Sequence, residues 1–175
     1  MYLSGKMGRR EVTFTIKNQV KMIEAIRIDL SDYAEEFRGF DINDVFLLSQ
    51  KEATQIWSDF IDKNAISFFD LPDTNWLISS KRIMVGEWMK DFNANESEYL
   101  SQKLDDVVNW DNSHIVFFCM KRENVIMTKW SQFKKLWIAF LYCEDDCPIL
   151  ISSVNTEYAF VFRPVGDVVL IDNRK

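Results

Sequence analysis

The stretch HIVFFCMKRENVIMTKWSQFKKLWIAFL, residues 114–141, decides the fold of this chain. Its first seven residues are apolar on both alternating faces, which is the pattern of a strand that is covered from both sides. The polar residues 121–124 lead into a second apolar run, Val125-Ile126-Met127. Two apolar runs joined by a short polar turn predict a β-hairpin.

A helix is expected directly after this hairpin. Thr128 is a plausible N-cap, because its hydroxyl can accept a hydrogen bond from a free N–H group of the first helical turn. Large apolar residues then share one side of a helical projection, with Leu136 and Ile138 on its flanks. The residues on that side are Trp130, Phe133, Trp137, Phe140 and Leu141. We therefore expect a helix whose aromatic side packs on the core.

Three further strand candidates follow the helix, at residues 148–152, 157–163 and 167–172. Only short links separate them. Short links between successive strands favour an antiparallel meander at the C-terminal end of the chain.

Upstream of the hairpin, two helices and one strand have recognisable signals. Ser49-Gln50-Lys51-Glu52 is a capping box, and the apolar residues from Ala53 to Ile61 fall on one helical face. Residues 95–98, Asn-Glu-Ser-Glu, are a second start signal for a helix that runs to Val108. Residues 12–16 alternate between apolar and polar, as in a strand. Residues 18–48 and 76–92 give no clear prediction.

Together these elements predict a single α+β domain over residues 1–175. Its antiparallel sheet ends in the C-terminal meander and packs against several helices. The short polar start, residues 1–10, is expected to be a flexible segment.

The net charge of −6 is unevenly distributed. Residues 1–27 carry six basic and two acidic side chains, a net +4, so the remainder carries −10. Residues 91–111 alone hold six acids against Lys103, a net −5. A surface this acidic repels phosphate backbones and attracts basic partners. The simpler alternative is that the acids only keep the protein soluble.

The counts of glycine, histidine and cysteine argue against several kinds of site. Five glycines leave little material for a phosphate-binding loop, and His114 is the single histidine. A zinc site would need Cys119, Cys143, Cys147 and His114 together, and small buried thiols are the simpler interpretation. We therefore predict no metal and no cofactor. An odd number of cysteines, with no apolar run long enough for a membrane helix and no secretory signal, points to the cytoplasm.

Catalytic arrangements are weakly supported. His114 and Cys119 are five residues apart on one predicted strand, so their side chains should point to opposite faces. Asp111 lies near His114 in the sequence, which leaves open an enzyme that uses His114 with a nearby acid. A nucleic-acid-binding domain that uses the basic region from Lys121 to Lys135 is another alternative, although its tryptophans are expected in the core.

One part of the chain resembles a known family. The residues that carry the resemblance are Val116-Phe117-Phe118-Cys119, Asn124-Val125-Ile126, Thr128-Lys129-Trp130, Phe133-Lys134, Trp137, Phe140-Leu141, Asp145-Asp146 and Pro148-Ile149-Leu150. Over about residues 115–166 they are similar to a small proteobacterial domain family of unknown function. Residues 53–60, around Trp57, are expected to continue the similarity upstream. This resemblance implies no activity, cofactor or site residue.

The leading hypothesis is a non-catalytic, cytosolic protein-binding domain. Most concretely, we expect an immunity or antitoxin-type protein that neutralises a basic bacterial toxin, such as a contact-dependent or secreted nuclease, through its acidic surface. The acids expected at this interface form two groups. They are Asp105, Asp106 and Asp111 in the first and Glu144, Asp145 and Asp146 in the second.

Overall fold

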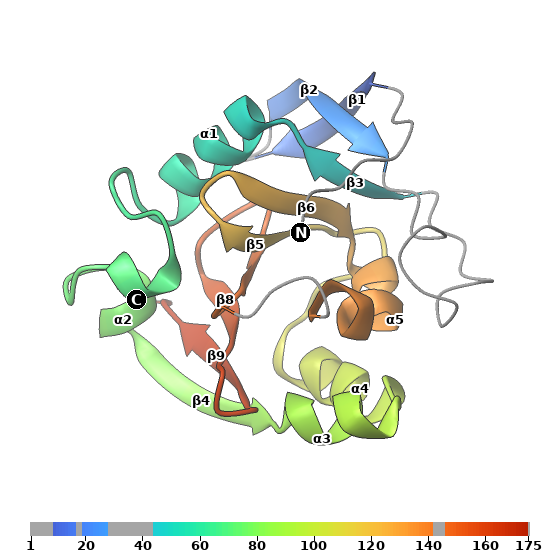
Figure 1. Ribbon diagram of the computed structural model, residues 1–175, viewed down its shortest axis with the longest axis vertical. Helices are drawn as coiled ribbons and strands as arrows, with labels where there is room; N and C mark the ends of the chain where they lie inside the picture. The colour runs from blue at the N-terminus through green and yellow to red at the C-terminus, as the bar shows by residue number, and fades with distance from the viewer. Residues whose placement is uncertain (1–8, 17–18, 28–43, 142–145, 175) are drawn as a thin grey trace.

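The computed structural model describes residues 9–16, 19–27, 44–141 and 146–174. Within these ranges nine strands form one sheet in the order β1-β2-β3-β6-β5-β7-β8-β9-β4, and every neighbouring pair is antiparallel (Figure 1). The strands are β1 (Arg9–Ile16), β2 (Gln19–Arg27), β3 (Val45–Leu48), β4 (Lys81–Gly86), β5 (Ile115–Lys121), β6 (Asn124–Lys129), β7 (Ile149–Ser152), β8 (Tyr158–Phe162) and β9 (Val168–Asp172). The helices are α1 (Gln50–Phe60), α2 (Trp76–Ser79), α3 (Trp88–Ala94), α4 (Glu98–Val107) and α5 (Trp130–Leu141). The fold is α+β, as predicted.

The sheet separates two hydrophobic cores. Helices α1 and α2 lie against one face, and α3, α4 and α5 lie against the other (Figure 1). Neighbouring residues of β5 enter different cores, Phe117 the first and Phe118 the second. The predicted hairpin is therefore confirmed as β5 and β6, and its apolar character on both faces is explained by a helix layer on each side.

The aromatic side of α5 is buried as expected. Trp130, Phe133 and Trp137 are fully buried. The ring of Phe118 in β5 lies 5.7 Å from that of Phe133 and 5.6 Å from that of Phe140, measured between centroids. Interlocked rings of this kind place α5 firmly on the sheet.

The expected N-cap of α5 is wrong. Thr128 is still part of β6, where its hydroxyl donates to the carbonyl of Asp44 at 2.9 Å. The first turn of α5 is instead satisfied by the loop before β5, because Trp130 N–H donates to the carbonyl of His114 and Ser131 N–H to that of Asn112. Backbone carbonyls supplied by the fold replace the side-chain cap.

The other predicted elements are present. The strand at residues 12–16 lies in β1, and β7, β8 and β9 form the C-terminal meander. Ser49 caps α1 by accepting from the backbone N–H of Glu52. The helix signal at residues 95–98 begins α4, but Asn95 has a left-handed conformation that ends α3. Residues 1–8 of the expected flexible segment lie outside the described residues, and Arg9 and Arg10 begin β1.

The sheet ends at β4, a strand that the sequence did not predict. Lys81, Arg82 and Met84 are exposed, so β4 lacks the apolar alternation of the other strands. Its last residue, Gly86, lies close to α4, because a Cβ atom there would be 3.2 Å from Cδ1 of Leu100. This close contact brings the end of β4, α3 and α4 together.

Candidate functional site

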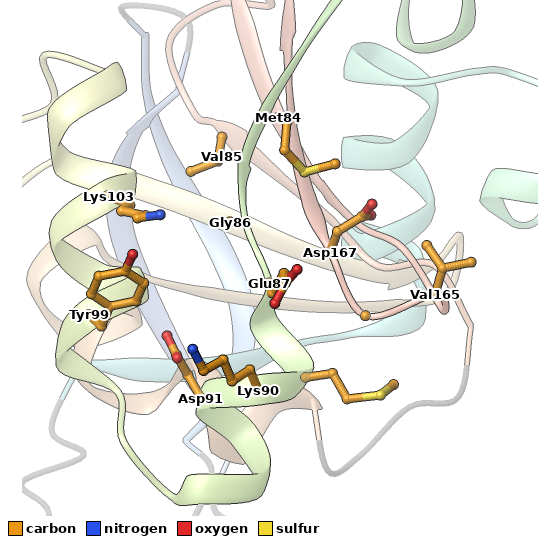
Figure 2. Close-up of a pocket in the computed structure, with 12 residues that line it drawn as sticks. Met84, Val85, Gly86, Glu87, Lys90, Asp91, Tyr99, Lys103, Val165 and Asp167 are labelled. Carbon is orange, nitrogen blue, oxygen red and sulfur yellow. The ribbon is translucent and has the colours of Figure 1, made fainter.

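A hollow of about 660 Å³ opens between the end of β4, helices α3 and α4, and the turn between β8 and β9 (Figure 2). We call it the α3–α4 groove. Its lining residues are Met84, Val85, Gly86, Glu87, Met89, Lys90, Asp91, Tyr99, Lys103, Val165, Gly166 and Asp167.

Specific contacts hold the β8–β9 turn against the start of α3. The indole N–H of Trp88 donates to the carbonyl of Arg163 at 2.9 Å, and Met89 N–H donates to the carbonyl of Gly166 at 3.1 Å. Gly166 has φ of 98°, and a Cβ atom there would be 2.9 Å from Cβ of Met89. An ion pair between Arg163 and Asp167 closes the turn. The wall of the groove is therefore built from segments about 75 residues apart in sequence.

Exposed apolar side chains gather in the groove. Within residues 44–141 and 146–174, six large hydrophobic side chains are exposed, and four of them line the groove. These four are Met84, Met89, Tyr99 and Val165, with exposed fractions of 58%, 39%, 57% and 78%. Exposed apolar side chains that cluster around a hollow are typical of interaction sites.

Asp91 is the most unusual residue of the groove. It lies in α3, is only 6% exposed, and its Oδ2 atom has no hydrogen-bond partner. The carboxylate accepts a hydrogen bond from the backbone N–H of Leu100. Burial raises the pKa of Asp91, and Glu96 adds to this effect, whereas the Leu100 hydrogen bond and the lysines nearby oppose it.

The lysines of the groove do not pair with Asp91. The ammonium of Lys103 lies 4.5 Å from the centroid of the Tyr99 ring. A hydrogen bond to Tyr99 raises the pKa of Lys103. Lys90 is exposed on α3. Figure 2 shows Tyr99 and Lys103 on α4, opposite the turn that carries Val165 and Asp167.

An acidic rim continues the groove along α4. A second hollow is lined by Asn95, Glu96, Ser97, Glu98, Tyr99 and Gln102, so the two hollows share Tyr99. Glu96 and Glu98 are exposed. Between residues 87 and 106 there are six acids against two lysines. Asp91 is buried and Asp105 is paired with Lys134, which leaves Glu87, Glu96, Glu98 and Asp106 to make this surface acidic as well as apolar.

A family model described as "Protein of unknown function (DUF2947)" matches residues 36–169. The chain belongs to this family. The matched residues extend well beyond the resemblance over residues 115–166. They include every residue that lines the α3–α4 groove. No curated protein and no solved structure matches the chain.

In this DUF2947 domain, the acids expected at an interface are placed at both ends of β5. Asp105 accepts hydrogen bonds from the indole N–H of Trp130 at 2.7 Å and from the ammonium of Lys134 at 2.5 Å. Asp111 accepts from Ser113, which lowers the pKa of its carboxyl. Asp106 is exposed on α4.

The second acidic group lies near the turn of the hairpin. Asp146 forms an ion pair with Lys121 at 2.8 Å. Glu144 and Asp145 lie outside the described residues. Lys121 and Ser113 are at opposite ends of β5, so the structure does not bring Asp111 and Asp146 together.

His114 forms a contact that the sequence did not reveal. Its Nε2 atom is 2.9 Å from the hydroxyl of Ser152, 38 residues away, and its ring stacks on Trp110. Burial lowers the pKa of His114, and the charge of Asp111 opposes this shift. Ser152 is only 1% exposed and also accepts from Val154 N–H, so a substrate would have no access to its hydroxyl. This pair fits a structural role better than a nucleophile and its base.

Most lysines of the basic region from Lys121 to Lys135 pair with acids of the same chain. Lys121, Lys129 and Lys134 form ion pairs with Asp146, Asp44 and Asp105. The indoles of Trp130 and Trp137 are buried, as expected, and cannot stack on bases.

Within the described ranges, no group of three or more histidine, cysteine or acidic residues is arranged to hold a metal ion. In the same part of the chain, no helix has the length and apolar character needed to cross a membrane. Cys119 and Cys147 are buried free thiols, and burial raises the pKa of both, that of Cys147 to about 12.

Proposed function

We propose that this chain is a non-catalytic protein-binding domain that captures a basic protein partner in the α3–α4 groove. The observation that carries the proposal is the gathering of four exposed apolar side chains and several acids around one hollow. In its most concrete form, the chain is a cytoplasmic immunity protein, and the partner is a basic bacterial toxin.

The chemistry of the groove fits this role. Apolar side chains such as Met84 and Val165 supply contact area that a partner can remove from water. Methionine adapts to partners of different shape because its side chain is flexible and polarisable. Acids on the rim, such as Glu96 and Glu98, attract a basic partner over several ångströms and accelerate encounter.

The acids expected from the sequence differ in how free they are to pair with another protein. Asp105, Asp111 and Asp146 have partners within the fold, so they have less freedom to pair with another protein. Asp106 is exposed on the same helix as the groove and stays a candidate contact. The free thiols of Cys119 and Cys147 are consistent with a reducing cytoplasm.

The test starts from the partner itself. The product of the neighbouring gene, or a protein crosslinked to the chain in its native cell, is purified, and its affinity is measured by calorimetry. We expect the double variant Met84→Ser, Val165→Ser to bind at least about tenfold more weakly, since removal of central apolar contacts costs more than 1 kcal/mol.

The chain offers a matched control for this experiment. Ile66 and Phe69 are 61% and 63% exposed but do not line the groove. The double variant Ile66→Ser, Phe69→Ser should bind within about twofold of the parent, since contacts outside an interface contribute little. Equal losses in the two double variants would contradict the proposal.

A further inference from the structure

The exposed sulfur atoms of the described chain gather in the α3–α4 groove. Within residues 44–141 and 146–174 the sulfur-bearing side chains are those of Met84, Met89, Met120, Met127, Cys119 and Cys147. Met84 and Met89 are 58% and 39% exposed and line the groove, whereas none of the other four is more than 4% exposed. In this part of the chain, a water-borne reagent that attacks sulfur therefore meets the groove first.

The cysteines do not compete for such a reagent. Cys119 and Cys147 are buried, and burial raises the pKa of both thiols. A cysteine reacts with peroxides as its thiolate, so a buried thiol with a raised pKa is inert near neutral pH. A thioether has no proton to lose, so access of the oxidant decides how fast a methionine reacts.

We propose that Met84 and Met89 form an oxidation site, at which hydrogen peroxide converts the thioethers to sulfoxides and so weakens capture of the basic partner. In each reaction an S–O bond forms and the O–O bond of the peroxide breaks. The sulfur is oxidised by two electrons, and the second oxygen leaves with both hydrogens as water. Oxidation itself needs no partner, whereas its effect on capture rests on the proposed function.

Sulfoxide formation changes the groove at the apolar contacts that a partner would cover. The Sδ atom of Met89 would lie 3.4 Å from a Cβ atom on Gly166, so this side chain lies against the β8–β9 turn. Figure 2 shows Met84 projecting toward the side of β4 on which Val165 lies. A sulfoxide is polar and hydrated, so a partner that covers it removes water without replacing its hydrogen bonds. Both methionines are exposed, so the fold itself should lose little stability.

Peptide mapping tests the oxidation site on the intact chain without a partner. The folded protein is treated with hydrogen peroxide near neutral pH and digested with trypsin. Trypsin releases both groove methionines in one peptide, residues 83–90, and Met120 and Met127 in two others. Fragment spectra assign each added oxygen to its residue. The groove methionines should oxidise at least about tenfold faster than the two buried ones, and the four rates should become similar in urea, where burial is lost.

Calorimetry with the purified partner tests the effect on capture. After complete oxidation of Met84 and Met89 the partner should bind at least about tenfold more weakly, since the contact must now cover a polar group. Methionine sulfoxide reductase should restore the affinity. In Met84→Leu with Met89→Leu, which lacks both thioethers, the affinities before and after peroxide should differ less than about twofold.

A matched control separates the groove from other methionines. Met7→Leu with Met22→Leu changes two methionines whose side chains lie outside the described residues. This variant should lose affinity after peroxide as the parent does. Circular dichroism spectra check that each protein is folded before and after oxidation. A loss in Met84→Leu with Met89→Leu equal to that of the parent would overturn the inference.

The outcomes separate this inference from the proposed function. Oxidation of Met120 or Met127 as fast as that of the groove methionines, or full affinity after complete sulfoxide formation, would overturn the oxidation site. If sulfoxide formation leaves the affinity unchanged while Met84→Ser, Val165→Ser still binds weakly, the oxidation site fails and the proposed function stands. If residues 83–90 oxidise first, but equally fast with the partner bound, and the serine double variant binds normally, the proposed function fails instead.

Discussion

At the scale of single residues, Asp91 and His114 show how burial sets the charge of a side chain. Both groups have a pKa shifted toward their neutral form, and desolvation is the main cause in each. The sequence could mark both as titratable but could not show their surroundings. The partner of His114 is 38 residues away in the chain, and the orphaned oxygen of Asp91 depends on the packing of α3 against α4.

We expect Asp91→Asn to stabilise the free protein. Because the pKa of Asp91 is raised in the folded state, the carboxylate lowers stability progressively as the pH rises above the ordinary aspartate value. Urea unfolding at pH 7 should show a gain of about 1 kcal/mol in the variant, and the gain should shrink toward pH 4. A variant that is less stable than the parent at pH 7 would mean that the carboxylate is net stabilising.

His114 should titrate below its ordinary pKa of about 6.5. The chain has one histidine, so its imidazole protons give a single set of NMR resonances. Asp111→Asn should lower the midpoint further, because the charge of Asp111 favours the imidazolium. Since the folded pKa is depressed, His114 makes the protein less stable as the pH falls below the unfolded value. A midpoint above 6.5 would rule out burial as the dominant effect.

At the scale of elements, apolar periodicity predicted the parts of the fold that are buried on one or two faces. The aromatic side of α5 and the hairpin β5–β6, which is apolar on both faces, are confirmed. Their large apolar side chains are buried in the two cores, and burial of such side chains is what the periodicity predicts. Thr128 was misplaced because a hydroxyl at the end of a strand can equally bond to a neighbouring loop, here at Asp44. Strand β4 was missed because Met84 is exposed together with Lys81 and Arg82, so apolar and polar residues do not alternate along it.

The candidate site was only partly visible at this scale, because none of the described acids expected at an interface, Asp105, Asp106, Asp111 and Asp146, lines the α3–α4 groove. The acidic stretch from Asp91 to Asp111 pointed to α4 and its surroundings, and Asp91, Tyr99 and Lys103 do line the groove. The opposite wall, with Val165 and Asp167, comes from a turn that is brought there by the Trp88 hydrogen bond to Arg163. No local pattern in one sequence encodes such a contact.

At the scale of the whole molecule, the structure shows where a large part of the uneven negative charge lies. The −10 carried by residues 28–175 includes six acids between residues 87 and 106, on the side of the sheet that carries α3 and α4. An acidic rim beside exposed methionines suits capture of a basic partner, because charge accelerates encounter and apolar contacts slow release. If the acids served only solubility, replacing those beside the groove would slow partner association no more than replacing acids elsewhere on the surface.

The association rate of the purified partner tests this account most directly, measured by stopped-flow fluorescence between about 20 and 300 mM salt, the range over which surface charges become screened. Glu96→Gln with Glu98→Gln should slow association several-fold at low salt and flatten its salt dependence. Asp73→Asn with Glu123→Gln removes two exposed acids that line neither hollow and should leave the rate nearly unchanged. Equal effects of the two double variants, or none from either, would contradict capture through the α3–α4 groove and its acidic rim.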